Sequence, residues 1–154
     1  MSKAIDIAAP LVKHFEGLYL TTYLCPAGKE TLGYGATGHD IAMGMTWTEA
    51  QADARLAEDL SEAENDVDEL VTVPLSDTEK AALISFVFNL GGHALESSTL
   101  LRVLNQGDRQ QATLEFLKWD KATVRGVKVP LRGLTLRRKA ESCLFATGKL
   151  MLPE

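Results

Sequence analysis

Three side chains near the amino terminus, Glu16, Cys25 and Thr31, form a set that could cleave a glycosidic bond. Hydrolysis of such a bond needs one acid that protonates the leaving oxygen and a second group that deals with the anomeric carbon. Glu16 can serve as the acid, and the other two follow it in the pattern Glu-x8-Cys-x5-Thr. Because this pattern alone arises by chance in many sequences, the elements around it must indicate whether the three residues meet.

The thiol of Cys25 leaves two mechanisms open. A free thiol has a pKa of about 8.5 and is mostly neutral at pH 7, so it is a poor base but a good nucleophile once ionised. Either Cys25 and Thr31 position a water molecule and the sugar inverts its configuration, or the thiolate attacks carbon and the configuration is retained. A third interpretation treats Cys25 as a small buried apolar residue. We expect Cys25 and Cys143 to be reduced thiols, with a disulfide between them as the alternative.

The first predicted elements place Glu16 at the boundary between a helix and a β region. Apolar residues recur with helical spacing over residues 4–14, and Pro10 inside this segment indicates an early turn or a kink. Glu16 follows at the carboxyl end, where the helix dipole disfavours a negative charge. Residues 19–44 are rich in Gly, Thr and Tyr, and a turn at 26–28 predicts a short antiparallel hairpin.

The remaining sequence predicts helices. Thr46 with Glu49 forms a capping box that begins a long amphipathic helix, which ends near Thr72. Ser76 with Glu79 forms the cap of an almost wholly apolar helix, which glycines 91–92 close. Shorter helices are expected over 98–105, 108–119 and 135–147, with a loop over 121–133.

These elements predict a single domain over residues 1–154 of the class α+β, mostly helical. Residues 1–45, with part of the long connecting helix, form a small amino-terminal lobe, and residues 74–149 form a helical carboxyl-terminal lobe. A cleft between the two lobes is the natural place for a polymer to bind.

The charge distribution also differs between the two halves. Residues 1–73 carry four basic and thirteen acidic side chains, whereas residues 74–154 carry twelve basic and eight acidic ones. A basic half suits a polyanionic ligand. The acidic run over 58–69 is interpreted as a solvated helix face.

Several classes of protein are excluded by composition and pattern. No apolar run approaches the roughly 20 residues that cross a bilayer. Lys3, Asp6 and Lys13 interrupt the amino-terminal segment, which is therefore not a signal peptide. The two distant cysteines show no metal-ligand spacing. We expect a soluble chain that is made in the cytoplasm and uses no metal and no cofactor.

Many separate motifs surround the three residues in a recognisable order. They include His-Phe-Glu-Gly at 14–17, Thr-Leu-Gly-Tyr-Gly at 31–35, Ala-Leu-Ile-Ser-Phe-Val-Phe-Asn-Leu-Gly at 82–91 and Gly-Leu-Thr-Leu-Arg-Arg at 133–138. Together they resemble the phage-lysozyme family, glycoside hydrolase family 24. The resemblance extends from about residue 4 to 148 and implies a lysozyme-like two-lobe fold.

The resemblance also implies a role for each residue of the set. Glu16 would be the general acid, Thr31 would help to hold the attacking water, and Cys25 occupies a position where the family carries Asp or Cys. Family members invert configuration as a rule, which requires roughly 6.5–9.5 Å between the two catalytic groups. The implied activity is that of an endolysin that hydrolyses β-1,4 bonds between N-acetylmuramic acid and N-acetylglucosamine in peptidoglycan.

Three further residues are candidates for binding or support. Arg137 is a candidate ion-pair partner of Glu16, although Arg137 or Arg138 is equally compatible with a solvated helix charge. Asn89 either bonds a sugar or satisfies the end of its helix. Tyr34, between two glycines, is expected to line the cleft.

Two alternative functions remain open. A binding module would hold peptidoglycan without cutting it, and Ala36 favours this reading because relatives often carry His there. A lytic transglycosylase would use Glu16 alone, first as acid and then as base.

The expected biological context follows from the resemblance. The chain would be a monomer that binds peptidoglycan glycan strands, with neither nucleic acid nor membrane as a partner. It would wait in the cytoplasm of the host bacterium until a holin gives it access to the periplasm and cell wall. A phage and a prophage origin are equally compatible.

Overall fold

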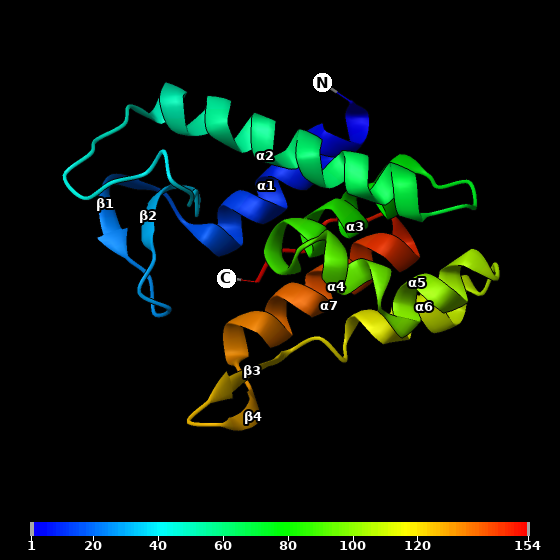
Figure 1. Ribbon diagram of the computed structural model, residues 1–154. Coiled ribbons are helices and arrows are strands. Elements are labelled where there is room, and N and C mark those ends of the chain that lie inside the picture. Colours follow the sequence, from blue (N-terminus) through cyan, green and yellow to red (C-terminus); the bar gives the residue numbers. More distant parts are fainter. Residues whose placement is uncertain (1, 154) are drawn as a thin grey trace.

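The computed structural model describes residues 2–153 as an α+β chain that is mostly helical (Figure 1), as the sequence predicts. The elements are, in chain order, α1 (Lys3–Glu16), β1 (Tyr19–Leu24), β2 (Glu30–Gly33), α2 (Glu49–Leu70), α3 (Asp77–Leu90), α4 (Gly92–Glu96), α5 (Thr99–Asn105), α6 (Arg109–Phe116), β3 (Lys121–Val124), β4 (Val127–Pro130) and α7 (Arg132–Thr147). Strand β1 pairs with β2, and β3 pairs with β4, so that the strands form two separate antiparallel hairpins.

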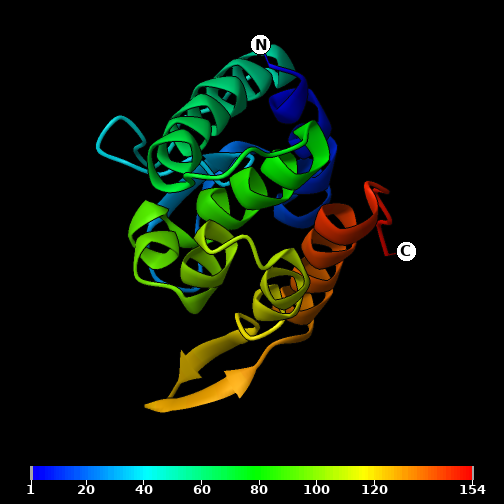
Figure 2. The same ribbon diagram turned by 90° about the vertical axis from the view of Figure 1, so that its right-hand side faces the viewer.

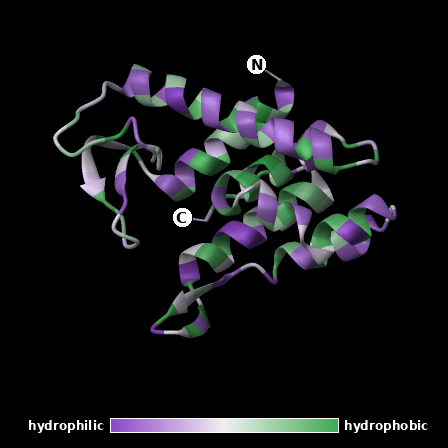
Figure 3. Ribbon diagram, in the orientation of Figure 1, coloured by the Kyte–Doolittle hydropathy of each residue, from purple (hydrophilic) through white to green (hydrophobic). Residues whose placement is uncertain are grey.

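Helix α3 lies at the centre of the core. It packs against α1, α2 and α7, and its buried residues run from Ala81 to Val87 without interruption. The predicted capping box of Ser76 and Glu79 is confirmed, and Gly91 ends the helix. Figure 3 shows α3 largely in the colours of hydrophobic residues, while hydrophilic residues recur along α2. A helix that is buried on all sides can hold the polar residues of two neighbouring helices in fixed positions.

Helix α1 brings Glu16 to the edge of this core. The Ser2 side chain accepts a hydrogen bond from the Ile5 backbone N–H at the start of the helix. The helix then continues through the exposed Pro10 without interruption. The predicted early turn at Pro10 is therefore wrong. Gly17, with φ 72°, ends the helix and turns the chain into β1, so that Glu16 stands where the helical core meets the first hairpin.

The amino terminus of α2 differs from the prediction. Thr48 and Gln51 form the capping box, not Thr46 and Glu49, and the helix ends at Leu70 rather than near Thr72. The reason is that Thr46 pairs with Thr21 in an isolated β-bridge. A backbone that is paired in this way cannot also open a helix.

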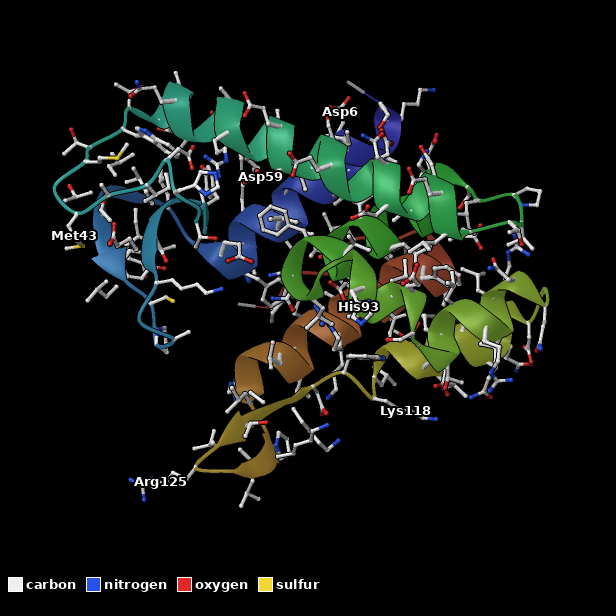
Figure 4. All side chains as sticks on the ribbon, viewed as in Figure 1. Asp6, Met43, Asp59, His93, Lys118 and Arg125 are labelled. Carbon is white, nitrogen blue, oxygen red and sulfur yellow. The ribbon has the colours of Figure 1, made fainter. Side chains whose placement is uncertain are left out.

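Residues 121–133 form a hairpin and the first turn of α7, whereas the sequence predicted a loop. Strands β3 and β4 pair antiparallel through a two-residue turn in which Arg125 and Gly126 have φ of 52° and 80°. Positive φ at both central residues matches the twist of a tight hairpin. The hairpin projects from the helical body (Figure 2), and Arg125 lies at its tip (Figure 4).

Within residues 2–153, no helix combines the length and the apolar character that crossing a membrane requires.

Candidate active site

The centre of the site is an ion pair between α1 and α7. Arg137 Nη1 donates a hydrogen bond to Glu16 Oε2 at 2.7 Å. The Arg137 side chain is 4% exposed and that of Glu16 is 21% exposed, so the carboxylate reaches solvent while its partner is enclosed. Charge-assisted hydrogen bonds of this kind fix the orientation of both groups. Arg137 is therefore no solvated helix charge.

A hollow of about 290 Å³ opens beside this pair. Its lining comes from α1, α3 and the start of α7, and consists of Phe15, Glu16, Asn89, Leu131, Gly133, Leu134 and Arg137. The predicted residues Glu16, Asn89 and Arg137 thus meet at one cavity. An acid, an amide and a guanidinium in a half-apolar hollow are suited to bind a polar polymer such as a glycan.

Gly35 covers the other side of the Glu16 carboxylate. A Cβ atom on Gly35 would lie 2.6 Å from Glu16 Oε1, closer than any real contact, and the residue has φ +80°. Only glycine tolerates both constraints without strain. The backbone after β2 thus approaches the carboxylate from the side opposite Arg137.

Cys25 and Thr31 form a second group at the β1–β2 hairpin. Cys25 lies at the turn and is half-buried, whereas Thr31 is buried in β2 and its hydroxyl donates to the Lys29 carbonyl at 3.0 Å. The backbone N–H of Lys29, followed by that of Ala27 and the Thr31 hydroxyl, holds the pKa of the Cys25 thiol below its ordinary value. Hydrogen bonds to a thiolate favour the charged form, which accounts for the direction of this shift. Cys25 and Cys143 are both free.

Tyr23 connects the two groups, and the sequence had given it no role. It stands opposite Thr31 in the hairpin, and its ring stacks at 4.1 Å from that of Tyr19. Burial raises the pKa of the Tyr23 phenol, and the charges of Tyr19, Glu16 and Cys25 raise it further. Because charge effects fall with distance, Tyr23 lies near enough to the acid and the thiol for a charge on either to act on it.

Tyr34 does not take the role expected for it. The residue is 8% exposed and belongs to the hydrophobic core, and Lys13 Nζ lies 5.2 Å from the centre of its ring. A side chain enclosed in this way packs the lobe and offers no surface to a substrate. Tyr34 was expected to line the cleft because of its place between two glycines. Those neighbours do not determine which residues cover its ring.

Behind the ion pair lies a set of buried polar groups that sequence reasoning missed. Arg138 and Glu141 are both fully buried and form an ion pair, with Arg138 Nε 2.7 Å from Glu141 Oε1. Ser85 Oγ donates to Glu141 Oε2 at 2.6 Å, and Arg138 Nη2 donates to Asn89 Oδ1 at 2.9 Å. Burial lowers the pKa of Arg138. One feature of the sequence could have indicated this set. Ser85 interrupts the apolar residues of α3, and a serine hydroxyl buried among apolar residues needs a hydrogen-bond partner.

No group of three or more His, Cys, Asp and Glu side chains in residues 2–153 is arranged to hold a metal ion.

Comparisons with known proteins give this geometry a family context. Residues 13–141 match the model of the family described as phage lysozyme. An endolysin of Acyrthosiphon pisum secondary endosymbiont phage 1 is 46% identical over 138 residues, which are 90% of this chain and 94% of that protein. Among solved structures, an endolysin from Escherichia coli O157:H7 phage FAHEc1 has a TM-score of 0.88 at 32% identity, covering 100% of this chain and 96% of the other. The muramidase domain of SpmX from Asticaccaulis excentricus has a TM-score of 0.86 at 35% identity, covering 92% and 95%.

Proposed function

We propose, since this chain belongs to the phage lysozyme family, that Glu16 is the proton donor of its reaction and that Cys25 and Thr31 hold the attacking water. The chain is an endolysin-type muramidase: it hydrolyses β-1,4 bonds between N-acetylmuramic acid and N-acetylglucosamine in bacterial peptidoglycan, and so lyses the host of the phage. The observation that carries the assignment of Glu16 is its 2.7 Å hydrogen bond to the enclosed Arg137 at the edge of a hollow of about 290 Å³.

The acid step begins with Glu16 in its protonated form. The carboxyl proton passes to the glycosidic oxygen as the bond to the anomeric carbon breaks, and the resulting carboxylate is stabilised by Arg137. This stabilisation appears as the charge develops, so it acts on the transition state more than on the bound substrate. Asn89 lines the same hollow and binds an oxygen of the sugar.

The water step uses the hairpin turn. Thr31 and Cys25 hold a water molecule on the face of the sugar opposite Glu16, and the water attacks the anomeric carbon with inversion. In its ionised form, which the lowered pKa favours, the Cys25 sulfur accepts the proton of the attacking water and becomes a neutral thiol. A direct attack by the thiolate would instead retain the configuration.

The glycan strand lies between two parts of one domain, residues 1–154. Gly35, after β2, and Arg137, in α7, approach Glu16 from opposite sides, which supports a cleft between an amino-terminal lobe (residues 1–45 with part of α2) and a helical lobe (residues 74–149). Two lobes on either side of the acid allow a long polymer to enter from the side, as an enzyme that cuts within strands requires.

The chain acts on the cell wall. We propose that it does so as a monomer, that it accumulates in the host cytoplasm, and that a holin gives it access to the periplasm.

Digestion of purified peptidoglycan tests this function. We expect wild-type protein to release muropeptides with reducing N-acetylmuramic acid ends, which mass spectrometry identifies. Glu16→Gln keeps the size of the side chain but removes the transferable proton, and it should lower the rate by roughly 10²–10⁴. Glu30→Gln changes an exposed carboxylate next to Thr31 and serves as the matched control with wild-type activity.

Three results would contradict the proposal. Products with anhydromuramic ends would indicate a lytic transglycosylase, and binding to cell walls without any cleavage would indicate a binding module. Full activity of Glu16→Gln with an unchanged circular dichroism spectrum would remove Glu16 from the reaction.

A further inference from the structure

Glu141 of α7 is a carboxylate with no access to solvent, and nothing in the reaction described above uses it. Its two oxygens face two consecutive arginines: Arg138 Nη2 donates to Oε2 at 3.0 Å, and Arg137 Nε lies 3.5 Å from the same atom. Burial of a carboxylate in a helical core is costly unless partners hold it. Two cations and a serine hydroxyl hold the Glu141 anion at this position. We therefore expect its role to lie in fixing those partners.

The first connection leads from Glu141 to the acid. Ser85 lies between Glu141 and Arg137: its hydroxyl donates to Glu141 Oε2 at 2.6 Å, while Arg137 Nη2 donates to the Ser85 carbonyl at 3.3 Å and its hydroxyl at 3.4 Å. Arg137 Nη1 remains for Glu16. The guanidinium is thus held on its inner side by Glu141 and Ser85, and only its outer nitrogen faces the acid.

The second connection leads to the amide that lines the same hollow. Arg138 is fixed by Glu141 and donates to Asn89 Oδ1 at 2.9 Å. This donor takes one of the two lone pairs of the amide oxygen and leaves both N–H hydrogens of Asn89 for a ligand. Both connections from Glu141 therefore end at residues that line one cavity, Glu16 and Asn89.

The charges of the four ionised groups balance. Glu16 and Glu141 offset Arg137 and Arg138 when all are charged. Once Glu16 takes up a proton, the remaining three groups carry one net positive charge. Without the charge of Glu141 they would carry two, and a protonated Glu16 would be disfavoured.

We propose that Glu141 is a positioning residue: it fixes Arg137 behind Glu16 and Arg138 behind Asn89, and its charge allows Glu16 to hold a proton. The proposal rests on the assignment of Glu16 as the acid. The titratable and polar groups near the acid are Arg137, Arg138 and Glu141 of α7, Tyr23 of β1, His14 of α1, and the uncharged Ser85 and Asn89 of α3.

The substitution Glu141→Gln tests the proposal directly. It keeps the volume of the side chain and removes its charge. We expect kcat to fall roughly ten- to a hundredfold, because the acid loses its fixed orientation. The basic limb of the pH–rate profile should move to lower pH by about one unit, because two uncompensated arginines favour the carboxylate of Glu16. KM should rise as Asn89 loses its fixed donor.

Glu115→Gln is the matched control. Glu115 is also a buried carboxylate in a helix, 3% exposed, and its partner Lys118 lies 2.6 Å away. It has no contact with the hollow beside Glu16. We expect this variant to lose stability while its pH–rate profile stays at the wild-type position.

A double variant keeps the test decisive if Glu141→Gln alone does not fold. Arg138→Met with Glu141→Gln removes one cation and one anion, so the charge around Glu16 again equals that of the wild type. The pH–rate profile should then return to its wild-type position, while KM stays raised because Asn89 has lost its donor. Glu141→Asp, which retains the charge, should likewise keep the wild-type pH dependence.

The outcomes separate this inference from the proposed function. If Glu16→Gln is inactive but Glu141→Gln retains the wild-type pH profile and KM, Glu141 is only a structural residue and the inference is wrong. Where Glu141→Gln does not fold, a wild-type KM in the double variant has the same meaning. If Glu16→Gln is fully active, the assignment of the acid fails first, whatever Glu141 does.

Discussion

The two sides of the site are built in different ways. On the acid side, Arg137, Arg138 and Glu141 are almost wholly enclosed by α1, α3 and α7. On the water side, Cys25 lies at the turn of a two-stranded hairpin, next to the exposed Leu24. An isolated two-stranded hairpin has little stability of its own. If Glu16 donates the proton and Cys25 and Thr31 hold the water, as we propose, proton donation depends on fixed, buried charges, whereas the hold on water depends on short-range hydrogen bonds from a turn.

Replacement of Arg137 by Met should have the largest effect of the changes that follow. Arg137 is the enclosed partner of Glu16 and lies next to Glu141, and removal of one member of a buried ion pair costs about 3–5 kcal/mol. Urea denaturation should report this loss. Lys13→Met is the comparison, since Lys13 and its partner Asp53 are 39% and 45% exposed and such pairs contribute at most about 1 kcal/mol. Equal losses for the two variants would contradict the difference drawn between buried and exposed pairs.

Gly35→Ala should have the next largest effect, because it acts on the carboxylate from the opposite side. The new Cβ would lie 2.6 Å from Glu16 Oε1, so the carboxyl must leave its position on Arg137. We expect activity to fall more than about tenfold and stability by about 1–2 kcal/mol from the positive φ. Gly107→Ala has a similar φ of +86° and open space around it, so it should lose stability alone. If both variants remain fully active, Gly35 does not constrain the acid.

The smallest effect concerns the chemistry of Cys25. Because hydrogen bonds from Lys29, Ala27 and Thr31 lower the pKa of its thiol, iodoacetamide should alkylate Cys25 at a pH below that needed by an ordinary thiol of pKa about 8.5. Mass spectrometry of the modified peptides measures the rate at each pH. Thr31→Val should move the profile to higher pH. An ordinary thiol profile in the wild-type protein would show that the turn does not favour the charged sulfur.

Much of the helical part could be predicted from the sequence. The apolar pattern and the Ser76–Glu79 capping box located α3, and the recurrence of Leu56, Leu60, Ala63 and Val67 located the buried face of α2. These signals are local, since a helix is formed by contacts three and four residues apart. The hairpin of β3 and β4 was missed, although Val124 and Val127 flank its turn, because an Arg-Gly turn carries a weaker signal than Asn-Gly.

The site could be predicted only in part. The order Glu16, Cys25 and Thr31 and the family motifs singled out the candidate residues, and Arg137 was correctly predicted as the partner of Glu16, but the buried groups that hold Arg137 were not predicted. Glu141 and Ser85 lie 56 residues apart in the chain, and no local pattern indicates such a contact. Tyr34 was expected to line the cleft, and the core encloses it instead, because the covering of a side chain is set by residues far away in the sequence.

The anomeric configuration of the first product tests the division between the two sides most directly. Proton NMR during digestion of a soluble glycan strand, within the first minutes and before the sugar mutarotates, reports whether the new reducing end is α or β. If Glu16 donates the proton and water enters from the side of Cys25 and Thr31, wild-type protein and Cys25→Asp both release the inverted α anomer. A β anomer from the wild-type protein would contradict this account, because it would require a covalent intermediate or attack from the side of the acid.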